Sequence, residues 1–278
     1  MVPAVARALA VMDLLARERA PLSMAGVALA LALPKSTVHG LCNTLLSFGY
    51  LRRGDSGALQ IGPSVMGLAE AFVLSTHVAR EFDALWQSAR AAPEETLILS
   101  VLSGAEVVYV GVRNSARPLG LAFNIGMRLP AHLAATGKAM LAFLDPAEVR
   151  ARLPRGPLQR LASGGVSSVP VLLTELALTR ERGYSIDDEG VRDGVYSMAA
   201  PVFDAAGQPV AGLGVCVNKA AVLGAEQHER QRRVVTDAAR TLSLRLGARF
   251  DRGADSAPLH AQAARIKLPA KPLSPRTP

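Results

Sequence analysis

Residues 33–51, LPKSTVHGLCNTLLSFGYL, carry polar and basic side chains at a spacing that suits contact with nucleic-acid bases. A helix that enters the major groove of DNA needs short polar and basic residues on one face. The helix predicted here presents such a face, made of Lys35, Ser36, Thr37, His39, Asn43 and Thr44. An ordinary solvated helix face is the alternative interpretation, so the surrounding elements must decide between the two.

Two consecutive arginines, Arg52 and Arg53, follow this helix at the start of a predicted hairpin. Residues 50–53 and 58–61 have the pattern of two short strands, and the turn sequence GDSG separates them. Arginines on such a hairpin can reach DNA phosphates, which position a protein on the duplex without reading its sequence. The pair therefore favours the DNA interpretation of the preceding helix.

A DNA-binding domain of this kind needs two further helices in front of the first. Apolar residues at helical spacing predict one helix over residues 4–17, and Ser23 is a suitable N-cap for a second that ends near Leu31. Pro34 fits the first turn of the third helix, and Gly49 fits the position just beyond its end. Three helices and a hairpin predict a winged helix-turn-helix.

The stretch AATGKA, residues 134–139, is the second place where chemistry is conceivable. It is not a phosphate-binding Walker A loop, because that motif needs glycine where His132 stands and serine or threonine where Ala139 stands. Free N–H groups at a helix start can instead offer partial positive charge to a small carboxylate. They would belong to Ala135, Thr136 and Gly137, with Lys138 as a long-range partner. The other interpretation is that Gly137 merely permits close packing.

Three consecutive acidic residues, Asp187, Asp188 and Glu189, could be metal ligands, an acid–base pair or part of a solvated loop. Cys216 lies in an apolar run and is by default an inert core thiol. No G-x-S-x-G nucleophile motif occurs. Metal-ligand spacing is missing among His39, His77, His132 and His228. We therefore predict no catalytic residue, no metal site and no cofactor, so the protein is not expected to be an enzyme.

Strands and helices follow one another through the rest of the chain and predict an α+β domain with an antiparallel sheet, of the kind that senses small molecules. Strands are predicted at 96–104, 106–113, 184–187, 196–203 and 209–217, and helices at 134–144, 171–182 and 226–248. The predicted organisation is a winged helix-turn-helix over 1–62, a linker helix over 63–77, a sensor domain over 78–250 and a disordered tail over 251–278.

Composition limits the class of protein. The 278 residues are 50% hydrophobic, which is globular and leaves room for about two domains. Two cysteines are too few for a disulfide framework and favour a reducing cytoplasm. No apolar run reaches the ~20 residues of a membrane span, and the N-terminus lacks the apolar core of a signal peptide. The net charge of +8 divides into +3 for residues 1–62, +2 for 63–250 and +3 for the rest, so nucleic-acid binding is expected at the N-terminus.

Several segments in the same order resemble the IclR family of bacterial transcriptional regulators. The third-helix segment lies between RALAVMDLLA and IGPSVMGLA, and the later segments are LPAHLAATGKAMLAFL and RERGYSIDDEGVRDGVYSMAAPVFDAAGQPVAGLGVCV. The resemblance covers residues 5–248. It implies a winged helix-turn-helix, a linker helix, an effector-binding domain with a GAF-like fold, and dimers or tetramers on operator DNA.

The chain departs from the family pattern in both halves. Gly40 stands where members usually carry arginine after the histidine of the recognition helix, and Leu59 and Gln60 stand where tyrosine and arginine are common. Each departure removes a possible contact with DNA. In the second half the resemblance implies effector contacts, alongside the helix start at 135–137, from Asp187, Ser197, Gly214 and Cys216. Because Gly214 has no polar group, a larger or more apolar pocket and a different ligand are expected.

The sequence therefore predicts a cytoplasmic regulator that binds double-stranded operator DNA as a homodimer or homotetramer and senses a small organic acid, without a membrane partner. A different class is the alternative: a small-molecule sensor or enzyme whose DNA-binding half has degenerated, which Gly40 suggests.

Overall fold

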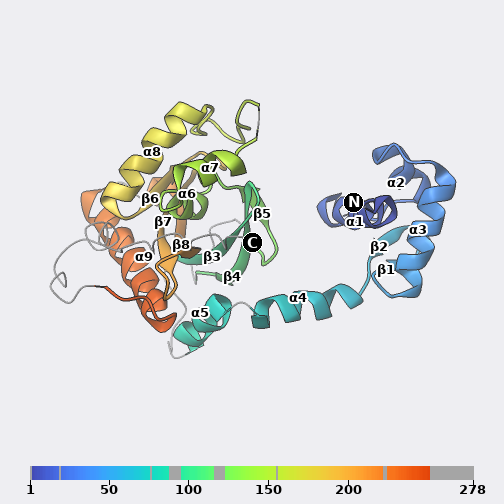
Figure 1. Cartoon of the computed structure of the whole chain (residues 1–278), viewed down its shortest axis with the longest axis horizontal. Helices are drawn as coiled ribbons and strands as arrows, with labels where there is room; N and C mark the ends of the chain where they lie inside the picture. Colours follow the sequence, from blue (N-terminus) through green and yellow to red (C-terminus); the bar gives the residue numbers. More distant parts are fainter. Residues whose placement is uncertain are drawn as a thin grey trace, which may run out of the picture. The chain divides into compact units, whose positions relative to one another are not determined.

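The computed structural model describes residues 2–18, 20–75, 77–87, 95–115, 123–154, 156–221 and 224–250 (Figure 1). These residues form two compact units that divide between residues 75 and 76, and each unit is described by itself. The tail predicted to be disordered, 251–278, lies outside the described residues.

The first unit contains the three predicted helices and the predicted hairpin, followed by a fourth helix. The elements are α1 (Pro3–Glu18), α2 (Met24–Ala30), α3 (Lys35–Ser47), β1 (Leu51–Arg53), β2 (Leu59–Ile61) and α4 (Ser64–Ser75). Their core is a cluster of buried side chains that includes Val11, Leu15, Val27, Val38, Cys42, Leu51 and Leu59. The strands are antiparallel, with Arg52 opposite Gln60. The winged helix-turn-helix prediction is confirmed.

The ends of α2 and α3 follow from local chemistry. The Ser23 hydroxyl accepts a hydrogen bond from the Gly26 N–H at 3.0 Å and caps α2, as predicted. Pro34 is the N-cap of α3 and not part of its first turn, one residue from the predicted place. Gly49 has a φ of +71°, and the Tyr50 N–H donates to the Leu45 carbonyl at 2.9 Å, which closes α3 in a Schellman motif.

Helix α4 occupies most of the range that the sequence assigns to a linker, and it belongs to the first unit. Its sequence, SVMGLAEAFVLS, is mostly apolar with one acidic residue, and Met66 and Leu68 are 71% and 58% exposed. No single helix among the described residues combines the length and the hydropathy that crossing a membrane requires; the pair α2 and α3 reaches both only together and is bent by 118°.

The second unit is built on a six-stranded antiparallel sheet with the strand order β5-β4-β3-β8-β7-β6. The strands are β3 (Thr96–Ser103), β4 (Glu106–Arg113), β5 (Arg128–Pro130), β6 (Ser185–Asp188), β7 (Val195–Phe203) and β8 (Pro209–Asn218). The helices are α5 (His77–Gln87), α6 (Ala135–Leu141), α7 (Pro146–Arg152), α8 (Val169–Arg182) and α9 (Ala225–Arg245), with a short 3-10 turn at Lys219–Ala221. The predicted α+β, GAF-like class is confirmed.

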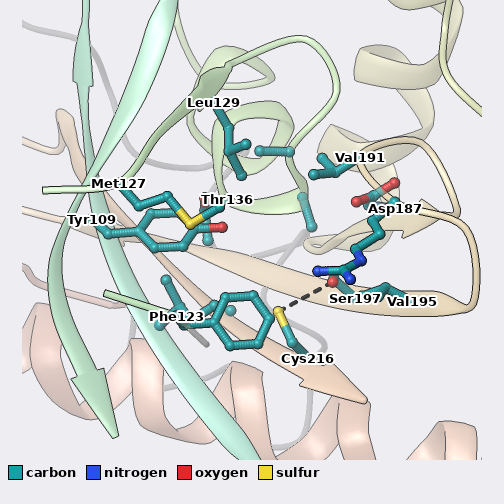
Figure 2. A pocket seen from close by; sticks show the side chains of 15 residues that line it. Tyr109, Phe123, Met127, Leu129, Thr136, Asp187, Val191, Val195, Ser197 and Cys216 are labelled. Carbon is teal, nitrogen blue, oxygen red and sulfur yellow. Dashed lines mark hydrogen bonds between the residues drawn. The ribbon is translucent and has the colours of Figure 1, made fainter. Parts of the chain in front are cut away.

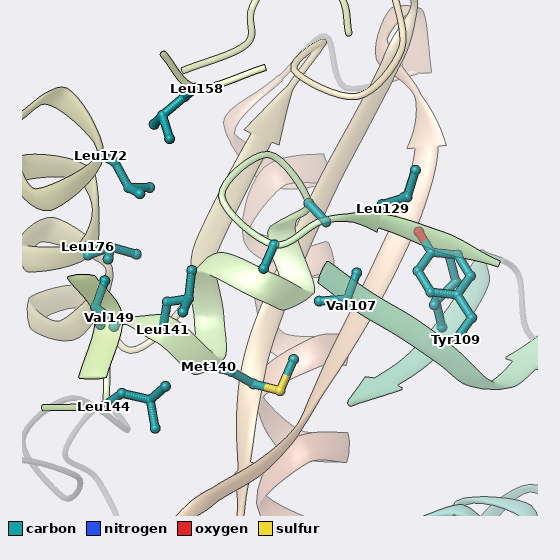
Figure 3. Close-up of a cluster of buried hydrophobic side chains, with 14 of the residues drawn as sticks. Val107, Tyr109, Leu129, Met140, Leu141, Leu144, Val149, Leu158, Leu172 and Leu176 are labelled. Atoms are coloured by element: carbon teal, nitrogen blue, oxygen red, sulfur yellow. The ribbon is translucent and has the colours of Figure 1, made fainter. Parts of the chain in front are cut away.

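Helices cover both faces of this sheet. Consecutive strand residues point to opposite faces, so the apolar strands offer side chains for packing on each face. Ile98 and Tyr109 belong to the cluster that α6, α7 and α8 complete with Met140, Val149 and Leu172 (Figure 3). A β-bulge in β4, where Ser100 pairs with Tyr109 and Leu99 pairs with Gly111, puts Gly111 on the other face, against the ring of Phe82 from α5. Helix α9 packs on β7 and β8 on that same side (Figure 3).

The sequence missed two short elements and overextended one helix. Helix α6 spans seven residues, fewer than the predicted 134–144. Strand β5 is only three residues long and gave no periodic signal. Helix α7 did leave a signal, because Asp145 precedes Pro146 and the Asp145 carboxylate accepts a hydrogen bond from the Ala147 N–H at 2.8 Å.

Candidate functional site

The exposed face of α3 is where the structure places the candidate DNA-reading residues. Lys35, Ser36, His39 and Asn43 are exposed, and Thr37 is half-buried. Asn43 Nδ2 lies 3.1 Å from His39 Nδ1, so these two side chains order each other on the helix surface. The opposite face of α3 packs into the core of the first unit. This arrangement leaves the polar face free to meet a groove.

The two arginines of the hairpin differ in their contacts. Both are exposed on β1. Arg53 Nη1 donates to the Gly57 carbonyl at 3.0 Å and holds the hairpin turn closed. The side chain of Arg52, which is opposite Gln60 in the hairpin, has no hydrogen bond or ion pair with the residues that the structure describes. Arg52 is therefore the freer of the two cations.

Gly40 lies in the middle of α3 and points into open space. A Cβ atom built on it would meet nothing within 4 Å. Its carbonyl accepts a hydrogen bond from the Thr44 hydroxyl at 3.0 Å. No tertiary contact therefore requires glycine at this position.

Replacing Gly40 with alanine should raise the free energy of unfolding of the first unit by about 0.5–1 kcal/mol, because alanine restricts the unfolded chain and favours helix. Urea unfolding followed by circular dichroism would measure the change. A destabilised variant would contradict the open space around Gly40.

The second unit contains a cavity of about 590 Å³, counting the part that is open to solvent (Figure 2). Its wall includes six of the seven residues predicted to contact an effector. These are Ala135, Thr136, Asp187, Ser197, Gly214 and Cys216. The remaining wall is largely apolar and is made by Ile98, Tyr109, Phe123, Met127, Leu129, Ala134, Val191 and Val195, with Arg192.

Gly137, the seventh predicted residue, is not part of the cavity wall. A Cβ atom on it would lie 2.2 Å from the Ala131 carbonyl oxygen, so it allows α6 to pack directly against the preceding loop. Gly214 has a similar role, since a Cβ there would lie 2.8 Å from Thr136 Cγ2. The space beside Gly214 is thus partly filled by the Thr136 methyl group.

Thr136 brings an unused polar group to the cavity. Its side chain is almost fully buried, and Oγ1 has no hydrogen-bond partner among the described residues. A buried hydroxyl without a partner costs free energy, and a ligand or a water molecule in the cavity would remove that cost. Figure 2 labels Thr136, Tyr109 and Met127 among the residues that line the cavity.

Asp187 is 3% exposed, at the end of β6, and forms part of the cavity wall. Its Oδ1 accepts a hydrogen bond from the Gly190 N–H at 2.7 Å. Burial raises the pKa of the Asp187 carboxyl from 3.8 to about 6, against the opposing charge of Lys138 and the N–H groups of Gly190 and Val191. The site therefore holds a carboxyl group that ionises only reluctantly.

Lys138 is not among the residues that line the cavity. Its side chain is buried on α6, with Nζ 3.6 Å from Glu175 Oε1, and Arg182 contacts the same carboxylate at 3.1 Å. Burial lowers the pKa of Lys138, while Glu175 and Asp187 oppose that shift. Lys138 and Arg182 thus share the carboxylate of Glu175, and Asp187 adds negative charge near Lys138.

Ser197 and Cys216 face each other across β7 and β8, and the Ser197 hydroxyl donates to Cys216 Sγ at 3.2 Å (Figure 2). Burial raises the pKa of the Cys216 thiol to about 12. A thiol with so high a pKa is not nucleophilic at neutral pH. Both residues offer hydrogen-bonding atoms, as predicted, without reactive chemistry.

The rest of the acidic cluster turns away from the cavity. Lys219 Nζ lies 2.8 Å from Asp188 Oδ1 and 2.6 Å from Glu189 Oε2. His132 is also absent from the wall, and its Nε2 lies 2.9 Å from the Gln159 carbonyl oxygen. Within the described ranges, no group of three His, Cys, Asp or Glu residues is arranged to hold a metal ion.

The sequence analysis missed the aromatic wall and Arg192, the one arginine among the described residues that line the cavity. Tyr109 and Phe123 belong to separate segments, and their ring centroids lie 6.4 Å apart. No short-range pattern connects them. Arg192 follows the last residue of the acidic cluster, Glu189, by three positions. This closeness in sequence was the one indication that Arg192 lies near Asp187 at the cavity.

Two family models match the chain: the IclR helix-turn-helix domain over residues 4–55, and the C-terminal domain of the bacterial transcriptional regulator IclR over residues 71–244. The chain belongs to the IclR family. The resemblance seen in the sequence is confirmed, and this IclR-family chain is a transcriptional regulator.

Individual relatives agree with this assignment. The transcriptional regulator KdgR of Dickeya chrysanthemi is 30% identical over 77% of this IclR-family chain and 70% of its own length. The regulator XynR of Escherichia coli is 29% identical over 77% of this chain and 86% of its own. Among solved structures, the Agobacterium tumefaciens repressor BlcR is 37% identical with a TM-score of 0.57, covering 90% of this chain and 99% of that one.

A solved IclR homologue from Microbacterium hydrocarbonoxydans was crystallised with 4-hydroxybenzoate. It is 24% identical to this chain, with a TM-score of 0.71 over 87% of this chain and 98% of that one. At that identity the likeness concerns the fold.

Proposed function

We propose that this protein acts in the cytoplasm as a ligand-responsive regulator. Its winged helix-turn-helix binds operator DNA as a homodimer, and a small organic acid binds in the cavity of the second unit. The main support for this proposal is the cavity itself, because six residues expected at an effector site line it. In addition, the buried hydroxyl of the wall residue Thr136 has no hydrogen-bond partner among the described residues.

The DNA-binding part of the proposal is supported by α3. Lys35, Ser36, His39 and Asn43 form an exposed polar face beside Thr37, and the hairpin adds two cations that can contact phosphates. A pair of such units binds two half-sites about one helical turn apart, or a multiple of that distance.

The homodimer is supported by the apolar surface of the first unit. Met66 and Leu68 on α4 are exposed, as are Val5 and Leu9 on α1. Exposed apolar side chains gathered on helices are characteristic of protein–protein contact surfaces. Effector binding would then act by changing how the two winged units are placed relative to each other.

The proposal is tested by a gel-shift titration with the DNA upstream of the protein's own coding region. Specific retardation that a small acid alters supports it. Absence of specific retardation would favour the alternative of a sensor or enzyme whose DNA-binding half has degenerated, which the open position of Gly40 in α3 suggests.

Two substitutions should separate phosphate contacts from base contacts. Arg52→Ala should weaken binding to all DNA sequences alike and lower the slope of log K against log salt by about one unit. Thr37→Ala should change the preference among operator variants. Equal, sequence-independent losses from both substitutions would show that these roles are assigned wrongly.

A further inference from the structure

The connection between β6 and β7 forms one part of the cavity wall. Its residues 189–194 are called the strap below. Within the strap, Val191 and Arg192 line the cavity (Figure 2). Arg192, Asp193 and Gly194 are exposed. The strap is therefore a stretch of wall with the cavity on one side and solvent on the other.

Both ends of the strap have a left-handed backbone conformation. The φ angle is +58° at Glu189 and +77° at Gly194. The Glu189 N–H donates to the Val195 carbonyl at 3.0 Å, which closes the β6–β7 hairpin where the strap begins. Hinges in proteins are commonly a few residues at the ends of elements, which absorb a change in φ and ψ. Glu189 and Gly194 are thus placed as hinges beside a paired hairpin.

Polar contacts hold the strap on both of its sides. Toward the cavity, Asp187 Oδ1 accepts a hydrogen bond from the Gly190 N–H at 2.7 Å. Toward solvent, Asp193 Oδ1 accepts hydrogen bonds from the N–H and the hydroxyl of Ser163, at 3.2 and 2.8 Å. Segments held by a few partly exposed hydrogen bonds open more easily than a packed core does.

Lys219, in the short turn after β8, contacts both ends of the strap. Its Nζ lies 2.6 Å from Glu189 Oε2 and 2.8 Å from Asp188 Oδ1, the last residue of β6. Its backbone N–H donates to the Gly194 carbonyl at 2.9 Å. The other carboxylate oxygen of Glu189, Oε1, accepts a hydrogen bond from the Gly194 N–H at 2.8 Å. The Lys219 ammonium therefore fixes the carboxylate that joins the two hinges.

We propose that the strap opens the cavity by turning at Glu189 and Gly194, and that the Lys219 ammonium holds it closed. The side chains of Lys219 and Asp188 are 43% and 52% exposed, so dissolved salt weakens their attraction. Removing the Lys219 charge or raising the salt concentration should then increase the open population. This inference rests on the proposed function, because it names the part of the wall that controls entry to the same cavity.

Chemical labelling of Cys216 in the full chain tests the inference. This thiol lines the cavity and is 6% exposed, so N-ethylmaleimide reaches it faster when the strap is open. Labelling is carried out at pH 7.5 without DNA or ligand, and labelled peptides are quantified by mass spectrometry. In Lys219→Met the labelling rate of Cys216 should rise about three- to tenfold, because the rate follows the open population.

Salt and a conservative variant show whether charge is the cause. Sodium chloride at about 1 M should raise the labelling rate of the wild type and leave that of Lys219→Met nearly unchanged, because the variant has no charge there to screen. Lys219→Arg keeps the charge and should label like the wild type. A wild-type rate that does not respond to salt would overturn the inference.

Two controls accompany the labelling. Arg152→Met removes another ion pair of the second unit, in which Arg152 Nη2 lies 2.7 Å from Glu148 Oε1 on α7, and Arg152 is not among the residues that line the cavity. This variant should label at Cys216 like the wild type. Cys42, buried in the core of the first unit, is the internal reference and should label at the same rate in every variant.

Hydrogen exchange followed by mass spectrometry separates opening of the strap from unfolding of the unit. In Lys219→Met the amides of residues 189–194 should exchange faster, while those of β3 keep their wild-type rates. Equally accelerated exchange in β3, or unchanged labelling of Cys216 in Lys219→Met, overturns the inference. Neither measurement uses DNA or a ligand, so these results leave the proposed function standing, and the gel shift with the upstream DNA tests that function separately.

Discussion

Replacing Gly137 with alanine should lower the free energy of unfolding of the second unit by about 3 kcal/mol. The new Cβ would lie 2.2 Å from the Ala131 carbonyl oxygen and 2.6 Å from the Ala131 Cα atom. These are backbone atoms, which cannot rotate away as a side chain would. The start of α6 must therefore shift from the loop before it, and buried contacts of α6 with the sheet are lost.

Urea unfolding followed by the fluorescence of Trp86, the one tryptophan of the chain, would measure this loss, since Trp86 belongs to α5 in the second unit. Gly156→Ala is the control in the same unit, because a Cβ at Gly156 meets nothing within 4 Å and should leave stability nearly unchanged. Equal stability of the two variants would contradict the close approach at Gly137.

Asp187→Asn should raise the free energy of unfolding of the second unit at pH 7.5 by up to about 3 kcal/mol. Burial raises the pKa of the Asp187 carboxyl from 3.8 to about 6, so the folded protein holds this proton more tightly than the unfolded chain does. The wild type therefore loses stability as the pH rises from about 4 to about 6. Asparagine cannot ionise, and its Oδ1 can still accept the hydrogen bond from Gly190.

The stability difference between Asp187→Asn and the wild type should be small at pH 4 and reach its full size above pH 6, as measured by urea unfolding across that range. Lys138 from α6 and Asp188 from β6 are the charged groups that act on Asp187, and neither is altered.

Asp193→Asn provides a control of opposite sign. Hydrogen bonds from Ser163 lower the pKa of the exposed Asp193 carboxyl, so its ionised form stabilises the protein at neutral pH. A stability gain for Asp187→Asn that is equal at both ends of the pH range would show that the carboxyl charge is not its cause.

Features governed by neighbours in sequence could be predicted from the sequence. The Ser23 cap of α2, the Gly49 stop of α3 and the two-strand hairpin each depend on a few consecutive residues, and all three are confirmed. The long strands β3, β4, β7 and β8 could be predicted for the same reason, since their apolar runs and turns are local. The ordered series of motifs was sufficient to identify the family.

The function of individual side chains in the second unit depended on contacts between distant segments. Gly137 directly follows Thr136 in sequence, but the two residues differ in role. The close approach of the Ala131 backbone makes Gly137 a packing residue, whereas Thr136 lines the cavity. The local sequence allowed both interpretations of Gly137. Only the path of the preceding loop distinguishes them.

The same holds for charge. The sequence shows three acidic residues in a row, but the fold buries Asp187 in the cavity wall and leaves Asp188 and Glu189 to pair with Lys219. It also brings Arg192 to a cavity whose aromatic wall comes from β4 and the segment before β5. The sequence by itself determined the family, the longer elements and six of the fifteen residues that line the cavity. The tertiary structure decided which are buried, paired or free, because burial and pairing depend on segments far apart in the chain.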